Sequence, residues 1–198
     1  MIHPDTELRF ISRDIGYGVV ATRLIPRGTI TWARDAFDQV FSPWAVERLV
    51  SPYHEFLEKY SFVDRAGNSV LCWDLARYVN HSCHASCLSA GYDFEIAVRD
   101  IQPGEELTDD YGTLNLEEDF PCLCGFPDCR LIIRPDDPLN LADRWDRQVA
   151  EVFPRIAIVE QPLWPFVEEK SEVKMALSGK APVASCMANH YSSRLCVA

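Results

Sequence analysis

Three short motifs follow one another between residues 77 and 130, and their order restricts the fold more than any other feature of this chain. The first reads Arg-Tyr-Val-Asn-His-Ser-Cys at residues 77–83, and the second reads Gly-Glu-Glu-Leu-Thr-Asp-Asp-Tyr-Gly at residues 104–112. The third is a tight cluster of Cys122, Cys124 and Cys129. Cysteines two positions apart are poorly placed to bridge each other, whereas their thiolates can converge on one tetrahedral zinc ion. The cluster therefore predicts a metal site just after the second motif.

Each motif alone has an ordinary structural explanation. Asn80 and His81 could close a turn through hydrogen bonds from side chain to backbone, and Tyr111 could be a core tyrosine with a satisfied hydroxyl. Together, in this order and spacing, the three motifs resemble those of SET-domain protein lysine methyltransferases, which carry a C-x-C-x4-C post-SET zinc motif at this place. The resemblance covers about residues 8–133.

The resemblance implies a mainly β fold, with short strands in several small sheets, short helices, and a pseudo-knot that brings the first two motifs to one site. It divides the chain into a stand-alone SET domain at residues 1–118, a post-SET-like zinc loop at residues 119–134, and a partly helical C-terminal extension at residues 135–198. Residues beyond 178 are small and polar, which favours a mobile tail.

Four thiolates are needed for a structural zinc site, and the third motif supplies three of them. By the resemblance, Cys83 is the fourth ligand beside Cys122, Cys124 and Cys129, and it ties the zinc loop to the active site. Cys87 is the alternative fourth ligand. Disulfides are disfavoured in a chain of this length without a signal peptide, so the remaining cysteines are expected to be buried free thiols, namely Cys72, Cys186 and Cys196.

The expected cofactor is S-adenosylmethionine. A Gly-x-Gly pair is common in turns, and no third glycine completes a dinucleotide-binding fingerprint here. In SET proteins a similar pair lets the main chain pass close to the cofactor, because glycine has no Cβ. The resemblance implies that the cofactor is contacted by Gly16, Tyr17, Gly18, Arg77, Asn80 and His81.

The resemblance also assigns the residues around the substrate amine. Tyr111 is implied as the catalytic residue, which orients the amine through its hydroxyl. Tyr60 is the candidate wall of the lysine channel, although a half-buried strand tyrosine is an equal interpretation. Asp109 stands where the family usually has Phe or Tyr. It either lies at the rim of the channel, where it captures the lysine, or faces solvent or caps a turn.

Composition restricts the partners. The chain of 198 residues carries a formal charge of -11, so direct nucleic-acid binding is not expected and a basic protein is the expected partner. No run of 18 apolar residues and no signal peptide is present, which predicts an intracellular protein, cytoplasmic or nuclear, that does not enter a membrane. The oligomeric state is left open.

Local patterns predict the individual elements. Strands are expected at about residues 8–11, 16–21, 29–32, 60–64, 69–73 and 94–100. Ser42 and Pro43 predict the N-cap and first position of a helix, a second short helix is expected at 52–58, and Asn140 is a possible N-cap for a helix at 141–153. Residues 168–174 resemble a solvated helical face.

These observations predict an S-adenosylmethionine-dependent protein lysine methyltransferase acting on a basic protein, histone-like or other. Two alternatives stay open: a non-catalytic SET module that binds basic tails, and a methyltransferase acting on small-molecule amines. The polar Asp109 leaves the number of methyl groups transferred undetermined.

Overall fold

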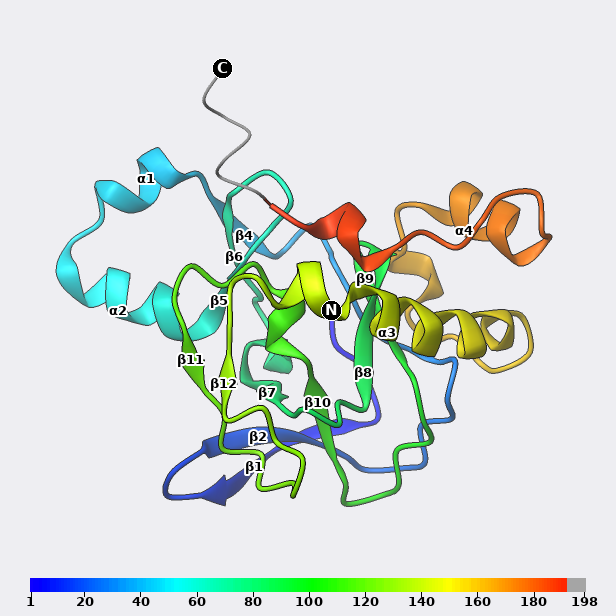
Figure 1. Ribbon diagram of the computed structural model, residues 1–198, viewed down its shortest axis with the longest axis horizontal. Coiled ribbons are helices and arrows are strands. Elements are labelled where there is room, and N and C mark those ends of the chain that lie inside the picture. The colour runs from blue at the N-terminus through cyan, green and yellow to red at the C-terminus, as the bar shows by residue number, and fades with distance from the viewer. Residues whose placement is uncertain (192–198) are drawn as a thin grey trace.

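The computed structural model describes residues 1–191, and small β-sheets with short helices make up this part of the chain (Figure 1). The largest sheet has the strand order β1-β2-β10-β7. Its strands are β1 (Thr6–Ser12), β2 (Gly16–Ala21), β10 (Glu106–Asp109) and β7 (Asn80–His81). The predicted fold class, mainly β in several small sheets with short helices, is confirmed.

Two three-stranded sheets and one two-stranded sheet complete the β structure. The first has the order β3-β9-β8, the second β4-β6-β5, and the third pairs β11 with β12. The bounds of these strands are β3 (Ile30–Ala33), β9 (Phe94–Ala97), β8 (Cys87–Tyr92), β4 (Gln39–Phe41), β6 (Ser69–Leu71), β5 (Ser61–Val63), β11 (Phe120–Pro121) and β12 (Ile132–Ile133).

The pairing of β7 with β10 brings the first two sequence motifs together. These strands are parallel, with Thr108 opposite Asn80 and Asp109 opposite His81. On its other edge β10 pairs antiparallel with β2, where Leu107 faces Val19. Leu107 and Val19 are buried in the same apolar cluster, so the core fixes the register of this sheet.

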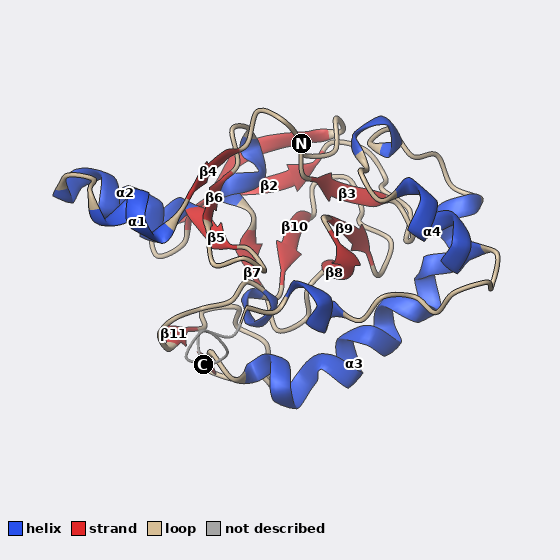
Figure 2. Ribbon diagram, turned by 90° about the horizontal axis from the view of Figure 1, so that it is seen from above, coloured by secondary structure: helices blue, strands red, loops and turns tan. Residues whose placement is uncertain are grey.

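The predicted helix starts are confirmed for the middle of the chain. Ser42 caps α1 (Pro43–Glu47) by accepting a hydrogen bond from the backbone of Ala45, and Pro43 occupies the first turn. The second helix, α2 (Ser51–Tyr60), is longer than predicted at both ends. In Figure 2, α1 and α2 extend away from the sheets.

The C-terminal extension packs into the same core as the sheets. Helix α3 (Asp137–Val152) buries Trp145, Val149 and Val152 against Phe94 and other strand residues, and it lies along one side of the sheets in Figure 2. Helix α4 (Lys170–Leu177) buries only Val173, as expected for a mostly solvated helix.

Two expectations for this extension are wrong. Helix α3 starts after Asp136, one turn earlier than Asn140, because Pro138 is compatible with the first turn of a helix. The segment after Ser178 is not a free tail up to residue 191. Its 3-10 helix, Cys186–Asn189, buries Cys186 in the main core, and Asn189 donates to Ser89 Oγ and to the Tyr92 carbonyl.

The predicted buried thiols are confirmed for Cys72 and Cys186, which are both buried and free, whereas Cys196 lies outside the described residues.

Short 3-10 helices connect the other elements, at Leu75–Tyr78, Tyr111–Thr113, Phe153–Ala157 and Trp164–Phe166. Within residues 1–191, none of the helices has both the length and the apolar character needed to cross a bilayer.

Candidate functional site

Gly18, Asn80 and Glu106 meet where β2, β10 and β7 lie side by side. The Asn80 amide donates to the Tyr17 carbonyl at 3.0 Å and to Glu106 Oε1 at 2.7 Å. A Cβ on Gly18 would collide with Glu106 Oε1 and would lie 2.8 Å from Asn80 Nδ2. A side chain at position 18 would therefore displace the Glu106 carboxylate and the Asn80 amide from their present positions.

A surface groove of about 510 Å³ lies next to the turn that precedes β2. It runs between the β1–β2 turn, at Ser12, Asp14 and Ile15, and Leu123 of the cysteine loop. Tyr17 is exposed and packs edge-on against Phe10, with 5.7 Å between ring centroids. The volume of the groove falls within the size range of small-molecule sites, and the turn that lines it leads directly into Gly16 at the start of β2.

His81 connects the first motif to the second. Its Nδ1 accepts a hydrogen bond from the backbone N–H of Tyr111 at 3.1 Å, and its Nε2 lies 3.5 Å from Cys83 Sγ. Burial, together with the nearby charge of Arg130, lowers the pKa of His81 to about 4. The ring is thus neutral near pH 7, with the proton on Nε2, because Nδ1 acts as an acceptor.

Tyr111 lies at the centre of the site. Its hydroxyl donates to the Val79 carbonyl at 2.8 Å, and its ring packs against His81 and Phe120. Burial, with the nearby carboxylates of Asp109 and Glu106, raises the pKa of Tyr111 well above its usual value. The side chain is therefore a neutral phenol, able to accept hydrogen bonds on its oxygen.

A cavity of about 100 Å³ opens against Tyr111 and Val79. Its aromatic lining comes from Trp32, Phe62, Tyr92 and Phe94. Asp109 also lines it, and this side chain is only 2% exposed. Asp109 Oδ1 accepts from the backbone N–H of Asp110 at 2.7 Å, and Oδ2 has no hydrogen-bond partner among the described residues. Asp109 thus faces the cavity and not solvent, which excludes the solvent-facing interpretation.

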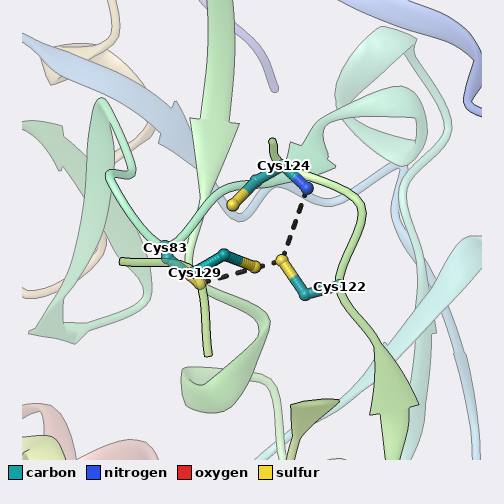
Figure 3. A group of neighbouring side chains, drawn as sticks. All are labelled: Cys83, Cys122, Cys124 and Cys129. Carbon is teal, nitrogen blue, oxygen red and sulfur yellow. Dashed lines mark hydrogen bonds between the residues drawn. The ribbon is translucent and has the colours of Figure 1, made fainter. Parts of the chain in front are cut away.

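The four predicted cysteine ligands converge. The sulfur atoms of Cys83, Cys122, Cys124 and Cys129 all lie within 4.8 Å of one another, and Figure 3 shows them turned toward a common point. Cys83 Sγ and Cys122 Sγ are 3.7 Å apart, close to the separation of about 3.8 Å that two ligands 2.3 Å from a tetrahedral zinc ion would have. Cys87, the alternative fourth ligand, is buried in β8 and is not a member of this cluster.

Backbone N–H groups point at the sulfurs. Arg130 N donates to Cys83 Sγ at 3.4 Å, Cys124 N to Cys122 Sγ at 3.5 Å, and Leu131 N to Cys129 Sγ at 3.3 Å. Leu131 adopts a positive φ of 63°, which is uncommon for a non-glycine residue. Donors of this kind favour the thiolate form of cysteine, which is the form that binds metal ions.

Arg130 joins the cysteine loop to the second motif. Its guanidinium donates to Asp110 Oδ1 through Nη2, to Asp137 Oδ2 through Nη1 at 2.8 Å, and to Cys83 Sγ through Nε at 3.5 Å. Burial disfavours the charge of Arg130, but Asp110 and the other acceptors raise its pKa above the usual value. The other oxygen of Asp110 accepts from Trp145 Nε1 at 3.1 Å.

Tyr60 and Arg77 were predicted as site residues, but their side chains contact other parts of the chain. Tyr60 is the last residue of α2 and does not begin a strand; its ring packs against Tyr78, 5.4 Å away, and it does not line the cavity. Arg77 turns back to its own segment, where it donates to the carbonyls of Trp73 and Asp74. Their roles in the channel and the cofactor site stay predictions.

Sequence reasoning missed Glu95, Glu106, Asp110, Arg130 and Trp145. Asp110 and Arg130 are the sequence neighbours of the predicted residues Tyr111 and Cys129. Their positions next to these motif residues could have marked both as candidates. Glu95 lies on β9 and Trp145 on α3, and only the packing of distant elements brings them to the site.

Residues 16–112 match the SET domain family. The histone-lysine N-methyltransferase TRX1 of Oryza sativa subsp. japonica is 38% identical over 77 residues, which cover 35% of this chain and 8% of that protein. An H3 lysine-4 specific histone-lysine N-methyltransferase of Schizosaccharomyces pombe is 42% identical over 64 residues, which cover 29% of this chain and 7% of that protein. The chain thus spans less than a tenth of the length of these relatives.

Two further similarities extend over more of the chain. An H3 lysine-36 specific histone-lysine N-methyltransferase of Debaryomyces hansenii is 28% identical over 129 residues, covering 58% of this chain and 17% of that protein. The methyltransferase domain of human histone-lysine N-methyltransferase SETMAR has a TM-score of 0.45 and 20% identity, covering 67% of this chain and 58% of that chain.

The junction at Gly18 can be tested by Gly18→Ala. Burial raises the pKa of Glu106, and the hydrogen bond from Asn80 opposes that rise. Loss of this bond should raise the pKa of Glu106 further, because the bond favours the charged form. Carbon NMR of the Glu106 carboxyl measures this. Gly179→Ala is the control for replacing a glycine away from the junction: a Cβ there meets no atom within 4 Å, and the strain at its φ of +71° lies far from Glu106 in the sequence. An unchanged Glu106 pKa in Gly18→Ala would show that the junction tolerates a side chain.

Proposed function

Residues 16–112 of this chain form a SET domain, and on this premise we propose that the protein transfers methyl groups from S-adenosylmethionine to lysine side chains of a basic protein. The observation that carries the proposal is the meeting of β2, β7 and β10, which brings Asn80 to the Tyr17 carbonyl and to the strand that leads into Tyr111, a residue that lines an aromatic cavity. A methyl transfer needs donor and acceptor held in line and away from water.

The cofactor is proposed to lie along Gly16, Tyr17 and Gly18, which follow directly on the β1–β2 turn that lines the groove. Asn80 and His81 hold the cofactor from β7, and Arg77 meets its polar portion. When bound, S-adenosylmethionine supplies a methyl group on a positively charged sulfur. The residues of this chain orient it and exclude water.

Tyr111 is the catalytic residue in this proposal. Its hydroxyl is neutral and already donates to the Val79 carbonyl, so its oxygen is free to accept a hydrogen bond from the substrate amine. Tyr111 therefore orients the amine and does not remove a proton from it. The lysine ammonium is proposed to lose its proton to solvent before transfer, because only the neutral amine has the lone pair that attacks the methyl group. A fixed polar group of this kind contributes to the electrostatics of the transition state.

The substrate is proposed to be a basic protein, histone-like or other. The relatives named above are histone-lysine methyltransferases, and this chain is acidic, with a formal charge of -11. Residues 117–119 are exposed and read Glu-Glu-Asp, directly before Phe120, whose ring packs against Tyr111. A negative segment beside the site would attract a Lys/Arg-rich segment.

The cysteine cluster is proposed to hold one structural zinc ion through Cys83, Cys122, Cys124 and Cys129. The division of the chain implied by the resemblance is kept as part of the proposal, with a SET domain at residues 1–118, a post-SET-like zinc loop at 119–134 and a partly helical extension at 135–198. Zinc would fix the loop that carries Leu123 at one edge of the groove. Metal and cofactor binding are therefore expected to depend on each other.

The proposed activity is tested with Tyr111→Phe. The protein is incubated with labelled S-adenosylmethionine and a panel of basic proteins, and label in each protein is counted. The variant should keep the fold and lower turnover by about 10² or more, the scale for loss of one fixed polar group. Label in small amines alone would favour the small-molecule alternative, and cofactor binding without any transfer would favour a binding module. Near-normal turnover in Tyr111→Phe would remove the catalytic assignment.

The metal assignment predicts about one zinc ion per chain by elemental analysis. Cys83→Ser should lose this zinc and the methyl-transfer activity together, because it removes one of the four ligands. Cys87→Ser is the matched control. It should keep the zinc, since Cys87 lies outside the cluster. A disulfide within the cluster of freshly reduced protein, or zinc retained in Cys83→Ser and lost in Cys87→Ser, would contradict the ligand set.

A further inference from the structure

Glu95 stands beside Asp109 in the lining of the aromatic cavity. Glu95 lies on β9 and Asp109 on β10, and both side chains line the same space. Desolvation raises the pKa of Glu95, and desolvation together with the negative charge of Glu95 raises that of Asp109. Each carboxyl group makes ionisation of the other less favourable, so the pair ionises at higher pH than isolated carboxyl groups do, and a single negative charge on the pair is shared between them.

This charge has no cationic partner in the cavity. Among the described residues that line it, Arg65 is the basic side chain, and Arg65 pairs with Asp93 at 2.8 Å. Asp64, at the same end, pairs with Arg34 at 3.3 Å. The lining acids outside the pair are thus neutralised, whereas the buried Asp109 carboxyl has Glu95 as its neighbour and, among the described residues, receives no hydrogen bond from a basic side chain.

The walls suit a cation on an aliphatic chain. Tyr92 and Phe94 are stacked, with 5.3 Å between centroids, and Trp32 meets Phe62 edge-on at 5.6 Å. Aromatic faces attract cations, and a narrow apolar space excludes water. The cavity of about 100 Å³ is smaller than the cavity of about 150 Å³ that holds benzene, so it fits a slender chain better than a ring.

We propose that Glu95 and Asp109 together form an ammonium-binding pair, which receives the charged head of the substrate lysine and positions it beside Tyr111. The proposal rests on the proposed function for the identity of the lysine, but the pair itself would bind any primary alkylammonium ion. Glu95 and Asp109 are then positioning residues. A single shared negative charge offsets the cost of burying one ammonium group.

The pair should make binding dependent on pH. Other titratable groups near it are Asp110 beside Asp109, the phenol of Tyr111, and the thiols of Cys87 on β8 and Cys72 after β6. Burial raises the pKa of both thiols and of the phenol, so these groups stay neutral below about pH 8. Binding should weaken as pH falls and the pair gains its second proton. This loss should begin at a higher pH than for ordinary carboxylates, because both pKa values are raised.

The test uses butylammonium, which has the length of a lysine side chain, and 1-butanol as its neutral counterpart. Calorimetry measures the binding of each to the full chain and to Glu95→Gln/Asp109→Asn. The double variant should bind butylammonium at least about tenfold more weakly, because its neutral side chains no longer attract the ammonium charge. A tenfold change in affinity is equivalent to a pKa shift of about one unit. The double variant should bind 1-butanol as the parent does. Should the double variant fail to fold, Glu95→Gln alone is judged by the same criterion.

Equal binding of butylammonium by parent and variant, or no binding by the parent, would overturn the proposal. In methyl transfer, Glu95→Gln should raise KM for the lysine substrate by about tenfold or more, with kcat changed much less. Glu151→Gln removes one exposed carboxylate from α3 and is the matched control. If butylammonium binds as predicted but no lysine is methylated, the proposed function fails and the ammonium site stands.

Discussion

The buried carboxylate of Asp110 holds the site together. One of its oxygens accepts from Arg130 of the cysteine loop and from the backbone of Gly112, and the other accepts from Trp145 of α3. Three parts of the chain that are distant in sequence therefore share one acceptor. A buried charge of this kind is costly unless all its partners are present, so the position of Tyr111 depends on the cysteine loop and on the C-terminal helix.

Much of the site was predictable because it lies in short, local motifs. The cysteines at 122, 124 and 129 indicated a cluster from their spacing alone, and the structure brings Cys83 to them. Ser42 and Pro43 predicted the start of α1, because capping depends on adjacent residues. The meeting of Asn80 with the strand before Tyr111 required the family resemblance, since a parallel pairing between distant segments leaves no local signal.

The rest was not predictable because it depends on tertiary packing. Glu95 alternates with apolar residues on β9, and nothing in that pattern distinguishes a carboxylate facing a cavity from one facing solvent. The end of the chain has the composition of a mobile tail, yet Cys186 and Asn189 pack on β8 and its neighbours. Arg130 looked like an ordinary residue after a cysteine. Its three acceptors come from Cys83, Asp110 and Asp137.

The central claim is that the ion pair between Arg130 and Asp110 couples the cysteine loop to the segment that carries Tyr111. A double-mutant cycle with Arg130→Gln and Asp110→Asn, read as the free energy of unfolding of zinc-loaded protein in urea, measures this coupling directly. We predict an interaction energy of about 2 kcal/mol or more, at the upper end of the range for contacting residues. Effects that add within about 0.5 kcal/mol would show that the two segments are stabilised independently, and would contradict the account.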